Sequence, residues 1–106
     1  MSDDRQVFKA TPTEDGSLAL SGELDALTVR HFNEALAVRN GALHVTLDVS
    51  ELTFIDSTGL HAIVSYVQSR EPDGTVTLRG ASPHIVRVLE ITCLSDLPRL
   101  RIDGAA

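Results

Sequence analysis

Residues 45–67 read VTLDVSELTFIDSTGLHAIVSYV, and this stretch decides the fold. Residues 45–49 alternate apolar and polar side chains, which is the period of a β-strand with one buried face. Further on, apolar residues recur at spacings of three and four and form one stripe along a helix that begins near Asp56 or Ser57. The stripe consists of Leu60, Ile63, Val64 and Val67. The stretch therefore predicts a strand that leads directly into an amphipathic helix.

The turn between this strand and this helix is Asp56-Ser57-Thr58-Gly59. If Ser57 is the N-cap, the third helical residue is Leu60 rather than Glu, so no capping box forms. If Asp56 is the N-cap, Ser57 projects from the first turn, and Ile55 and Leu60 can form a hydrophobic staple. In both registers the hydroxyl lies beside the positive end of the helix, where anions are favoured. Ser57 is therefore either a capping residue or a site for a phosphate.

The N-terminal part of the sequence predicts a β-hairpin. Residues 5–11 and 17–21 read as short strands, and the segment 13–16 between them ends in Asp-Gly, a turn signal because glycine accepts a positive φ. The segment Gly22-Glu23-Leu24-Asp25 then breaks the alternation, so we expect the second strand to end before it.

A helix follows the hairpin. Asp25 or Thr28 can cap its start, and Asn40-Gly41 can end it, because both residue types tolerate the left-handed conformation found at helix ends. Its apolar side consists of Val29, Phe32, Ala35 and Leu36.

The C-terminal part predicts one strand, one helix and a last strand. Pro72 and Gly74 end the central helix, and residues 75–79 form a strand with one apolar face. Ser82-Pro83 is a strong helix start, because serine caps and proline suits the first helical position. A final strand lies around Leu100. The buried side of the last helix consists of Ile85, Val86, Leu89 and Cys93.

The predicted order of elements is ββαβαβαβ in one domain of 106 residues, with no linker and no repeat. Strands that alternate with helices imply parallel pairing through right-handed crossovers. We therefore expect an α/β sandwich with a mixed, mostly parallel sheet of about four to five strands, helices packed on it, and an antiparallel hairpin at one side.

The composition restricts the partners. A net charge of −6 and few aromatic side chains argue against nucleic acid, whose phosphates demand a basic surface. Cys93 is the single cysteine, so no internal disulfide forms. The acidic start lacks the features of a targeting peptide, and no apolar run approaches the roughly 18 residues that a membrane-spanning helix needs. We expect a cytoplasmic protein without direct membrane insertion, whose partner is another protein.

The motifs of catalysis are missing from the sequence. A nucleophile elbow around Ser57 would need glycine at position 55, where the chain has Ile55. There is no Cys-x-x-Cys or His-x-x-x-His pair for a metal and no phosphate-binding P-loop. We therefore expect no enzyme activity, no cofactor and no metal.

Three stretches together resemble the STAS domain, and specifically the bacterial anti-sigma factor antagonists. The resemblance spans almost the whole chain, and its central motif, Asp-Ser-Ser/Thr-Gly-Leu, is specific when a strand precedes it and an amphipathic helix follows. The stretches are Gly22-Glu23-Leu24-Asp25, then Phe54-Ile55-Asp56-Ser57-Thr58-Gly59-Leu60, then Ala81-Ser82-Pro83 with residues 86–94.

The resemblance implies a mechanism of partner switching. In the family, an anti-sigma factor that is also a serine kinase phosphorylates the serine after the aspartate, which corresponds to Ser57. Unmodified antagonist binds this kinase and frees a sigma factor, phosphorylated antagonist lets go, and a PP2C-type phosphatase resets the switch. His61 stands where relatives often have glycine and is expected to influence the choice of partner. The implied partner-binding residues are Asp25, Asp56, Ser57, Thr58, Gly59 and His61.

A second branch of the family is also similar, namely the small STAS subunit of bacterial phospholipid-transporting ABC systems. It resembles residues 18–25 and 76–80 of this chain and would act as an assembly or regulatory factor for an ATPase. Its central motif usually has threonine where Ser57 stands. Ser57-Thr58 and Ser82-Pro83 favour the sigma pathway.

Overall fold

The computed structural model describes residues 8–38, 42–70, 73–92 and 94–104. The predicted order of strands and helices is confirmed, with one short 3-10 helix (η1) added before the last strand. The elements are β1 (Lys9–Pro12), β2 (Leu18–Leu24), α1 (Val29–Ala37), β3 (His44–Ile55), α2 (Ser57–Gln68), β4 (Thr75–Ala81), α3 (Pro83–Ile91), η1 (Leu94–Asp96) and β5 (Leu100–Gly104).

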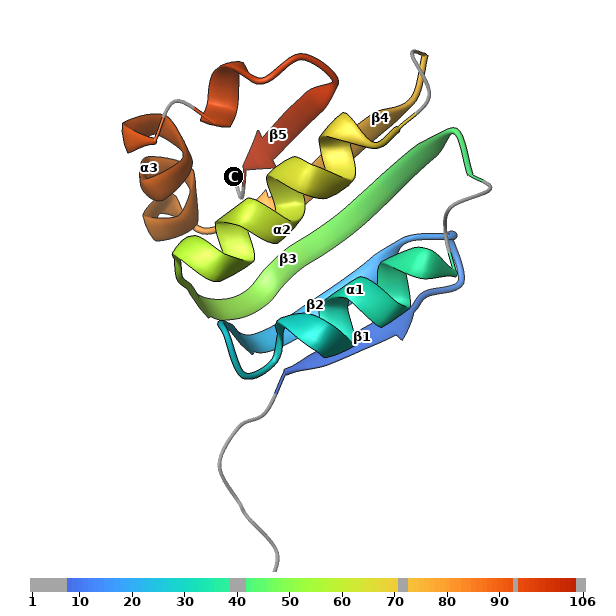
Figure 1. Cartoon of the computed structure of the whole chain (residues 1–106), viewed down its shortest axis with the longest axis horizontal. Coiled ribbons are helices and arrows are strands. Elements are labelled where there is room, and N and C mark those ends of the chain that lie inside the picture. The colour runs from blue at the N-terminus through green and yellow to red at the C-terminus, as the bar shows by residue number, and fades with distance from the viewer. Residues whose placement is uncertain (1–7, 39–41, 71–72, 93, 105–106) are drawn as a thin grey trace, which may run out of the picture.

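The strands form one five-stranded sheet in the order β1-β2-β3-β4-β5. β1 pairs with β2 in antiparallel fashion, and the other three pairs are parallel. The prediction of a mostly parallel sheet with a hairpin at one side is therefore confirmed. Each strand lies beside its neighbour in sequence, as the colours of Figure 1 show.

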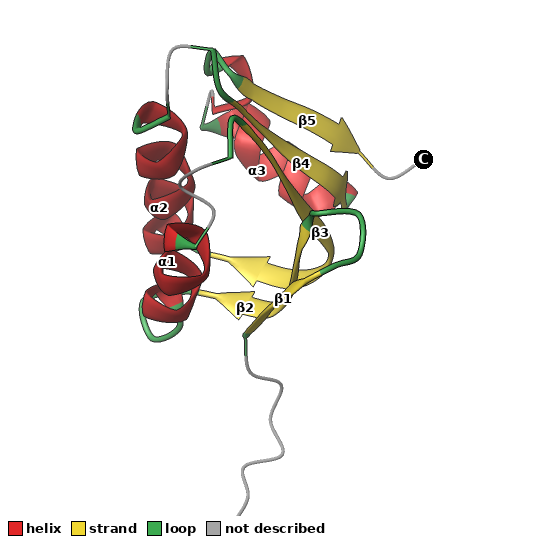
Figure 2. Ribbon diagram, turned by 90° about the vertical axis from the view of Figure 1, so that its right-hand side faces the viewer, coloured by secondary structure: helices red, strands yellow, loops and turns green. Residues whose placement is uncertain are grey.

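One face of the sheet is covered by helices and the other is open. α1 and α2 lie on the same side of the strands in both views (Figures 1 and 2). Burial alternates along β2 and along β4 as far as Arg79, and the residues that alternate with the buried ones are half-buried or exposed. The open face is polar, with Thr46, Thr77, Arg79 and Arg101 among its residues. The largest fully buried side chains include Phe32, Leu18, Leu20, Leu24, Leu47, Ile63, Leu78, Ile85 and Leu89.

The prediction that β2 ends before Gly22 was wrong, because β2 continues to Leu24. Gly22 has a φ of +90° and lies at an irregularity of the β2–β3 register, where the extra residue, Thr53, is on β3. Burial continues to alternate along β2 through Leu24, so glycine interrupts the apolar pattern without ending the strand. The strand prediction for residues 45–49 was likewise too short, since β3 runs on to Ile55.

Other expected ends differ from the observed ones. β1 begins at Lys9 rather than at residue 5, and residues 5–7 lie outside the described residues. α1 ends at Ala37, and the expected stop at Asn40-Gly41 also lies outside the described ranges, as do residues 71–72 and Cys93. The Ser82-Pro83 start of α3 is confirmed, because the Ser82 hydroxyl accepts a hydrogen bond of 3.2 Å from the Ile85 N–H. Within the described ranges, no helix has the length and apolar character needed to cross a membrane.

Candidate functional site

The site lies where β2 and β3 end side by side. Leu24 pairs with Ile55 as the last residues of these parallel strands, and the Asp56 N–H donates to the Leu24 carbonyl at 3.2 Å. The segment that begins with Asp25 and the turn that carries Ser57 therefore emerge next to each other at one end of the sheet (Figure 1). The pairing of the two strands thus places Asp25 beside the turn that carries Ser57.

Asp56 is the N-cap of α2. Its backbone is extended, and its carboxylate accepts the Gly59 N–H at 3.0 Å. Its carbonyl accepts the Leu60 N–H at 2.9 Å, which is the first bond of the helix. Of the two registers that the sequence allowed, the structure has the one in which Ser57 does not cap.

Ser57 and Thr58 are the first two residues of α2, and both are exposed. N–H groups in the first turn of a helix have no acceptor inside it. Asp56 uses the N–H of Gly59, so those of Ser57 and Thr58 remain beside the Ser57 hydroxyl. A negative group on this hydroxyl would therefore lie at the positive end of the helix.

Asp25 organises the turn that leads into α1. One carboxylate oxygen accepts the N–H groups of Leu27 at 2.9 Å and Thr28 at 3.1 Å. The Thr28 hydroxyl in turn accepts the Asp25 N–H at 3.0 Å and donates to the Glu23 carbonyl at 2.8 Å. The reciprocal bonds hold this turn in one conformation, so Asp25 has a structural role besides any contact with a partner.

Gly59 is buried and lets α2 rest directly on the end of β2. A Cβ atom at this position would lie 2.8 Å from Leu24 Cγ, 2.9 Å from the Leu24 carbonyl oxygen and 2.9 Å from Ile55 Cγ1. Gly59 thus determines how closely the start of α2 packs against the strand ends. We expect any contribution of Gly59 to partner binding to come from this position of the helix and not from direct contact.

His61 lies one helical turn after Ser57 and is exposed. Residues four apart on a helix share a face, so His61 and Ser57 present their side chains to the same side of α2. This geometry is compatible with the predicted role of His61 in the choice of partner, which stays a prediction.

Two exposed apolar residues that were not among the predicted site residues belong to the same end of the sheet. Leu27, in the Asp25 turn, is 89% exposed, and Phe54, three residues before Ser57, is 43% exposed. Both residues are apolar but stand outside any periodic apolar pattern. This isolation is the one sequence signal that could have predicted their exposure. The surrounding segments are acidic, because residues 22–29 and 50–62 contain no Lys or Arg. Their carboxylates are Glu23, Asp25, Glu51 and Asp56.

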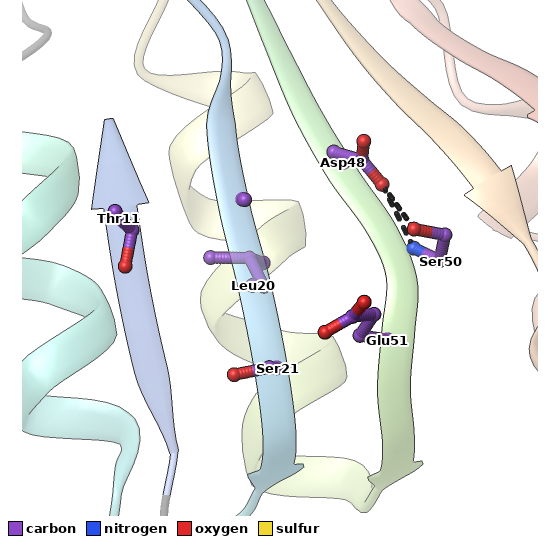
Figure 3. Close-up of a pocket in the computed structure, with 7 residues that line it drawn as sticks. Thr11, Leu20, Ser21, Asp48, Ser50 and Glu51 are labelled. Atoms are coloured by element: carbon purple, nitrogen blue, oxygen red, sulfur yellow. Dashed lines mark hydrogen bonds between the residues drawn. The ribbon is translucent and has the colours of Figure 1, made fainter. Parts of the chain in front are cut away.

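A depression of about 220 Å³ lies elsewhere, on the open face between β1, β2 and β3 (Figure 3). Asp48 at its rim is already engaged, since one carboxylate oxygen accepts the N–H of Ser50 at 3.0 Å and its hydroxyl at 2.7 Å, and the other pairs with Arg79 at 3.2 Å. The Ser50 N–H in particular, with the Ser50 hydroxyl, lowers the pKa of Asp48 below its ordinary value. The lining residues are Thr11, Ala19, Leu20, Ser21, Asp48, Ser50 and Glu51.

This depression does not show the arrangement of a metal centre. Among the residues that the structure describes, no three His, Cys, Asp or Glu side chains converge on one point.

Comparisons with known proteins identify a STAS domain and relatives named anti-sigma factor antagonists. A family model described as "Mlab, STAS domain" matches residues 7–101. Proteins named anti-sigma-B factor antagonist from Listeria monocytogenes and Listeria innocua are each 33% identical over 98 residues, which cover 89% of this chain and 85% of theirs.

Solved structures show the same fold. The crystal structure of an anti-sigma factor antagonist from Mycobacterium paratuberculosis superimposes with a TM-score of 0.71 at 20% identity, covering 90% of this chain and 84% of that one. The unphosphorylated form of the anti-sigma factor antagonist SpoIIAA gives a TM-score of 0.66 at 17% identity, covering 94% and 90%.

Proposed function

Because the chain belongs to the STAS domain family, and within it to the anti-sigma factor antagonists, we propose that it binds an anti-sigma factor with serine kinase activity and so releases a sigma factor. Phosphorylation of Ser57 by the bound kinase ends the complex, and a PP2C-type phosphatase restores the binding form. One observation carries the proposal: Asp56 caps α2, which leaves the Ser57 hydroxyl exposed at the helix start without a structural task.

The charges around Ser57 explain how a phosphate would act. A phosphoserine adds about −1.5 to −2 charges at neutral pH and a strongly hydrated group. Asp56 precedes it and the Asp25 turn lies beside it, so the phosphate enlarges a negative surface on a protein with a net charge of −6. A partner surface that fits the free hydroxyl would then face added volume and hydration.

The folded domain itself should tolerate the phosphate. The free N–H groups of Ser57 and Thr58 and the helix dipole favour an anion at this position, by about 0.3–1 kcal/mol for an exposed group. The modification therefore weakens binding more than it weakens the fold. Asp25, Asp56, Thr58 and His61 would contact the partner directly, and Gly59 would act by placing α2.

Incubation with Mg-ATP and each anti-sigma kinase encoded in the same genome tests the proposal, with mass spectrometry to locate the phosphate. We expect one phosphate on the wild-type chain at Ser57, no label on Ser57→Ala, and full labelling of the control Thr58→Ala. If Ser57→Ala is labelled as well as the wild type, the switch is not at Ser57.

Binding decides between the two branches of the family. Co-purification with a serine kinase that releases its sigma factor supports the proposal, and Ser57→Asp should abolish that complex while its thermal unfolding stays that of the wild type. Co-purification with an ABC ATPase instead would support the alternative, in which the chain is the STAS subunit of a phospholipid-transporting system.

A further inference from the structure

Leu27 is an apolar side chain that the fold holds in the solvent. The Asp25 carboxylate accepts the Leu27 N–H at 2.9 Å, and Thr28 closes the same turn through Glu23, so the backbone around Leu27 is fixed. The side chain is nevertheless 89% exposed. Because the backbone is already ordered, binding a partner through this side chain does not cost the ordering of the turn, which favours binding.

Phe54 is a second such side chain, on β3. Its neighbour Ile55 is buried, and its partner in the β2–β3 ladder is Glu23, which is exposed. Paired residues point to the same side of a sheet, so Phe54 emerges with Glu23 on the open face. The ring is 43% exposed, at the same end of the sheet as Ser57.

The acidic groups of this end indicate the chemistry of the partner. Glu23 is the ladder partner of Phe54, and Asp25, Glu51 and Asp56 belong to the same two segments as the apolar side chains. These segments, residues 22–29 and 50–62, hold no Lys or Arg, and Lys9 lies two strands from Glu51 on the ladder through Ser21. Interfaces commonly combine an apolar centre with a charged rim of opposite sign.

We propose that Leu27 and Phe54 are the apolar contacts through which this chain recognises its anti-sigma factor, whose docking surface offers an apolar recess flanked by Arg or Lys side chains. The inference rests on the proposed function and adds to it the residues that supply affinity independently of Ser57. It also separates two effects: the apolar contacts determine how tightly the unmodified chain binds, and Ser57 determines when it lets go.

The chain offers matched controls for this proposal. Val38, at the end of α1, is 83% exposed, and Ile91, at the end of α3, is 68% exposed. Both are large apolar side chains outside the segments 22–29 and 50–62. If removing any exposed apolar side chain weakens binding, substitutions at Val38 and Ile91 will weaken it as much as those at Leu27 and Phe54. If Leu27 and Phe54 make specific contacts, only their substitution will weaken binding.

The test measures binding of the unphosphorylated chain to its anti-sigma kinase by isothermal titration calorimetry. We expect Leu27→Ser and Phe54→Ser each to raise Kd by about tenfold or more, as interface anchors do, and Val38→Ser and Ile91→Ser to leave it within about twofold. Wild-type Kd should also rise steeply between low and high salt if the recess is flanked by basic groups.

Two further measurements separate a loss of folding from the loss of an apolar contact. Phe54 is partly buried, so thermal unfolding of each variant is recorded, and Phe54→Leu, which keeps an apolar side chain, should recover most of the affinity. If the wild type binds and the Leu27 and Phe54 variants bind equally well, or if all four serine variants weaken alike, the inference is overturned while the proposed function stands. If the wild type binds no anti-sigma kinase, both fall.

Discussion

At the scale of single residues, adjacent side chains in the Ser57 turn do different work. The Asp56 carboxylate accepts the Gly59 N–H, and the Ser57 side chain makes no comparable hydrogen bond. Sequence reasoning could name both as possible caps but could not choose, because the cap is fixed by where β3 ends. That end is set by a distant partner, the Leu24 carbonyl, which accepts the Asp56 N–H. The exposed serine was predictable, and the identity of the cap was not.

The division of work between Asp56 and Ser57 predicts different effects on stability. Asp56→Ala removes the cap and should lower the free energy of unfolding by about 0.5–2 kcal/mol. Ser57→Ala should change the free energy of unfolding by less than about 0.5 kcal/mol, because the hydroxyl that it removes is exposed and makes no hydrogen bond within the protein. Urea titrations of both variants measure this, with Asp56→Asn as the control that keeps a capping oxygen. An equal loss in the two alanine variants would contradict the assignment of the cap.

Gly59 gives a second prediction at this scale. In Gly59→Ala the new methyl group would lie within 2.9 Å of Leu24 and Ile55, so α2 must move away from the strand ends. We expect a loss of about 1–3 kcal/mol, the usual cost of overpacking. Ser65→Ala, at an exposed position of α2, is the control and should be neutral or slightly stabilising, because alanine has the higher helix propensity. A Gly59→Ala protein as stable as the wild type would show that the helix is free to shift.

At the scale of elements, strongly periodic segments were predictable and interrupted ones were not. The stripe of α2 and the Ser82-Pro83 start of α3 were found where the sequence placed them. The second half of β3 was missed, because Ser50 and Glu51 are two consecutive exposed residues and break the alternation. The register of β2 on β3 shifts here and again at Thr53 and Phe54, so the strand continues through two irregular steps. Periodicity alone cannot distinguish such a step from the end of a strand.

The missed half of β3 can be tested through Leu52. Its side chain is only 4% exposed and belongs to the core, so Leu52→Ala should lower the free energy of unfolding by about 2–4 kcal/mol. Glu51→Ala, at the adjacent exposed position, should cost less than about 0.5 kcal/mol. Chemical denaturation measures both values. If the two substitutions cost the same, residues 50–55 do not pack as a strand over the core.

At the scale of the whole molecule, Arg79 joins segments that are far apart in sequence. It pairs with Asp48 on β3 at 3.2 Å and with Asp15, in the β1–β2 turn, at 3.1 Å. These partners form a polar link across the open face, which none of the described helices covers (Figure 2). Hydrogen bonds from Thr13 and Ser17, with the one from Arg79, lower the pKa of Asp15, and those from Ser50, with Arg79, lower the pKa of Asp48.

This link predicts a dependence of stability on acid pH. Since the pKa of Asp48 in the folded chain is below its ordinary value of 3.8, its ionised form stabilises the fold above that pH, and the contribution is lost as pH falls through the lowered pKa. The difference in free energy of unfolding between the wild type and Asp48→Asn should therefore be constant near neutral pH and shrink below about pH 4.

A second variant separates the causes of this dependence. Arg79→Gln should remove only a minor part of it, because the two bonds from Ser50 remain. Urea titrations from pH 2 to 7 measure the effect. A difference that grows on acidification would contradict the lowered pKa.

The strand order of the sheet, which equals the order along the chain, has a consequence for biosynthesis. No strand has to enter between two that have already paired, so each new unit can dock on the edge left by the previous one as the chain leaves the ribosome. The hydrogen bond from Asp56 to Leu24 and the seat of Gly59 on Leu24 involve only β2, β3 and the start of α2. The turn that carries Ser57 can thus take its final shape before β4, α3 and β5 have docked.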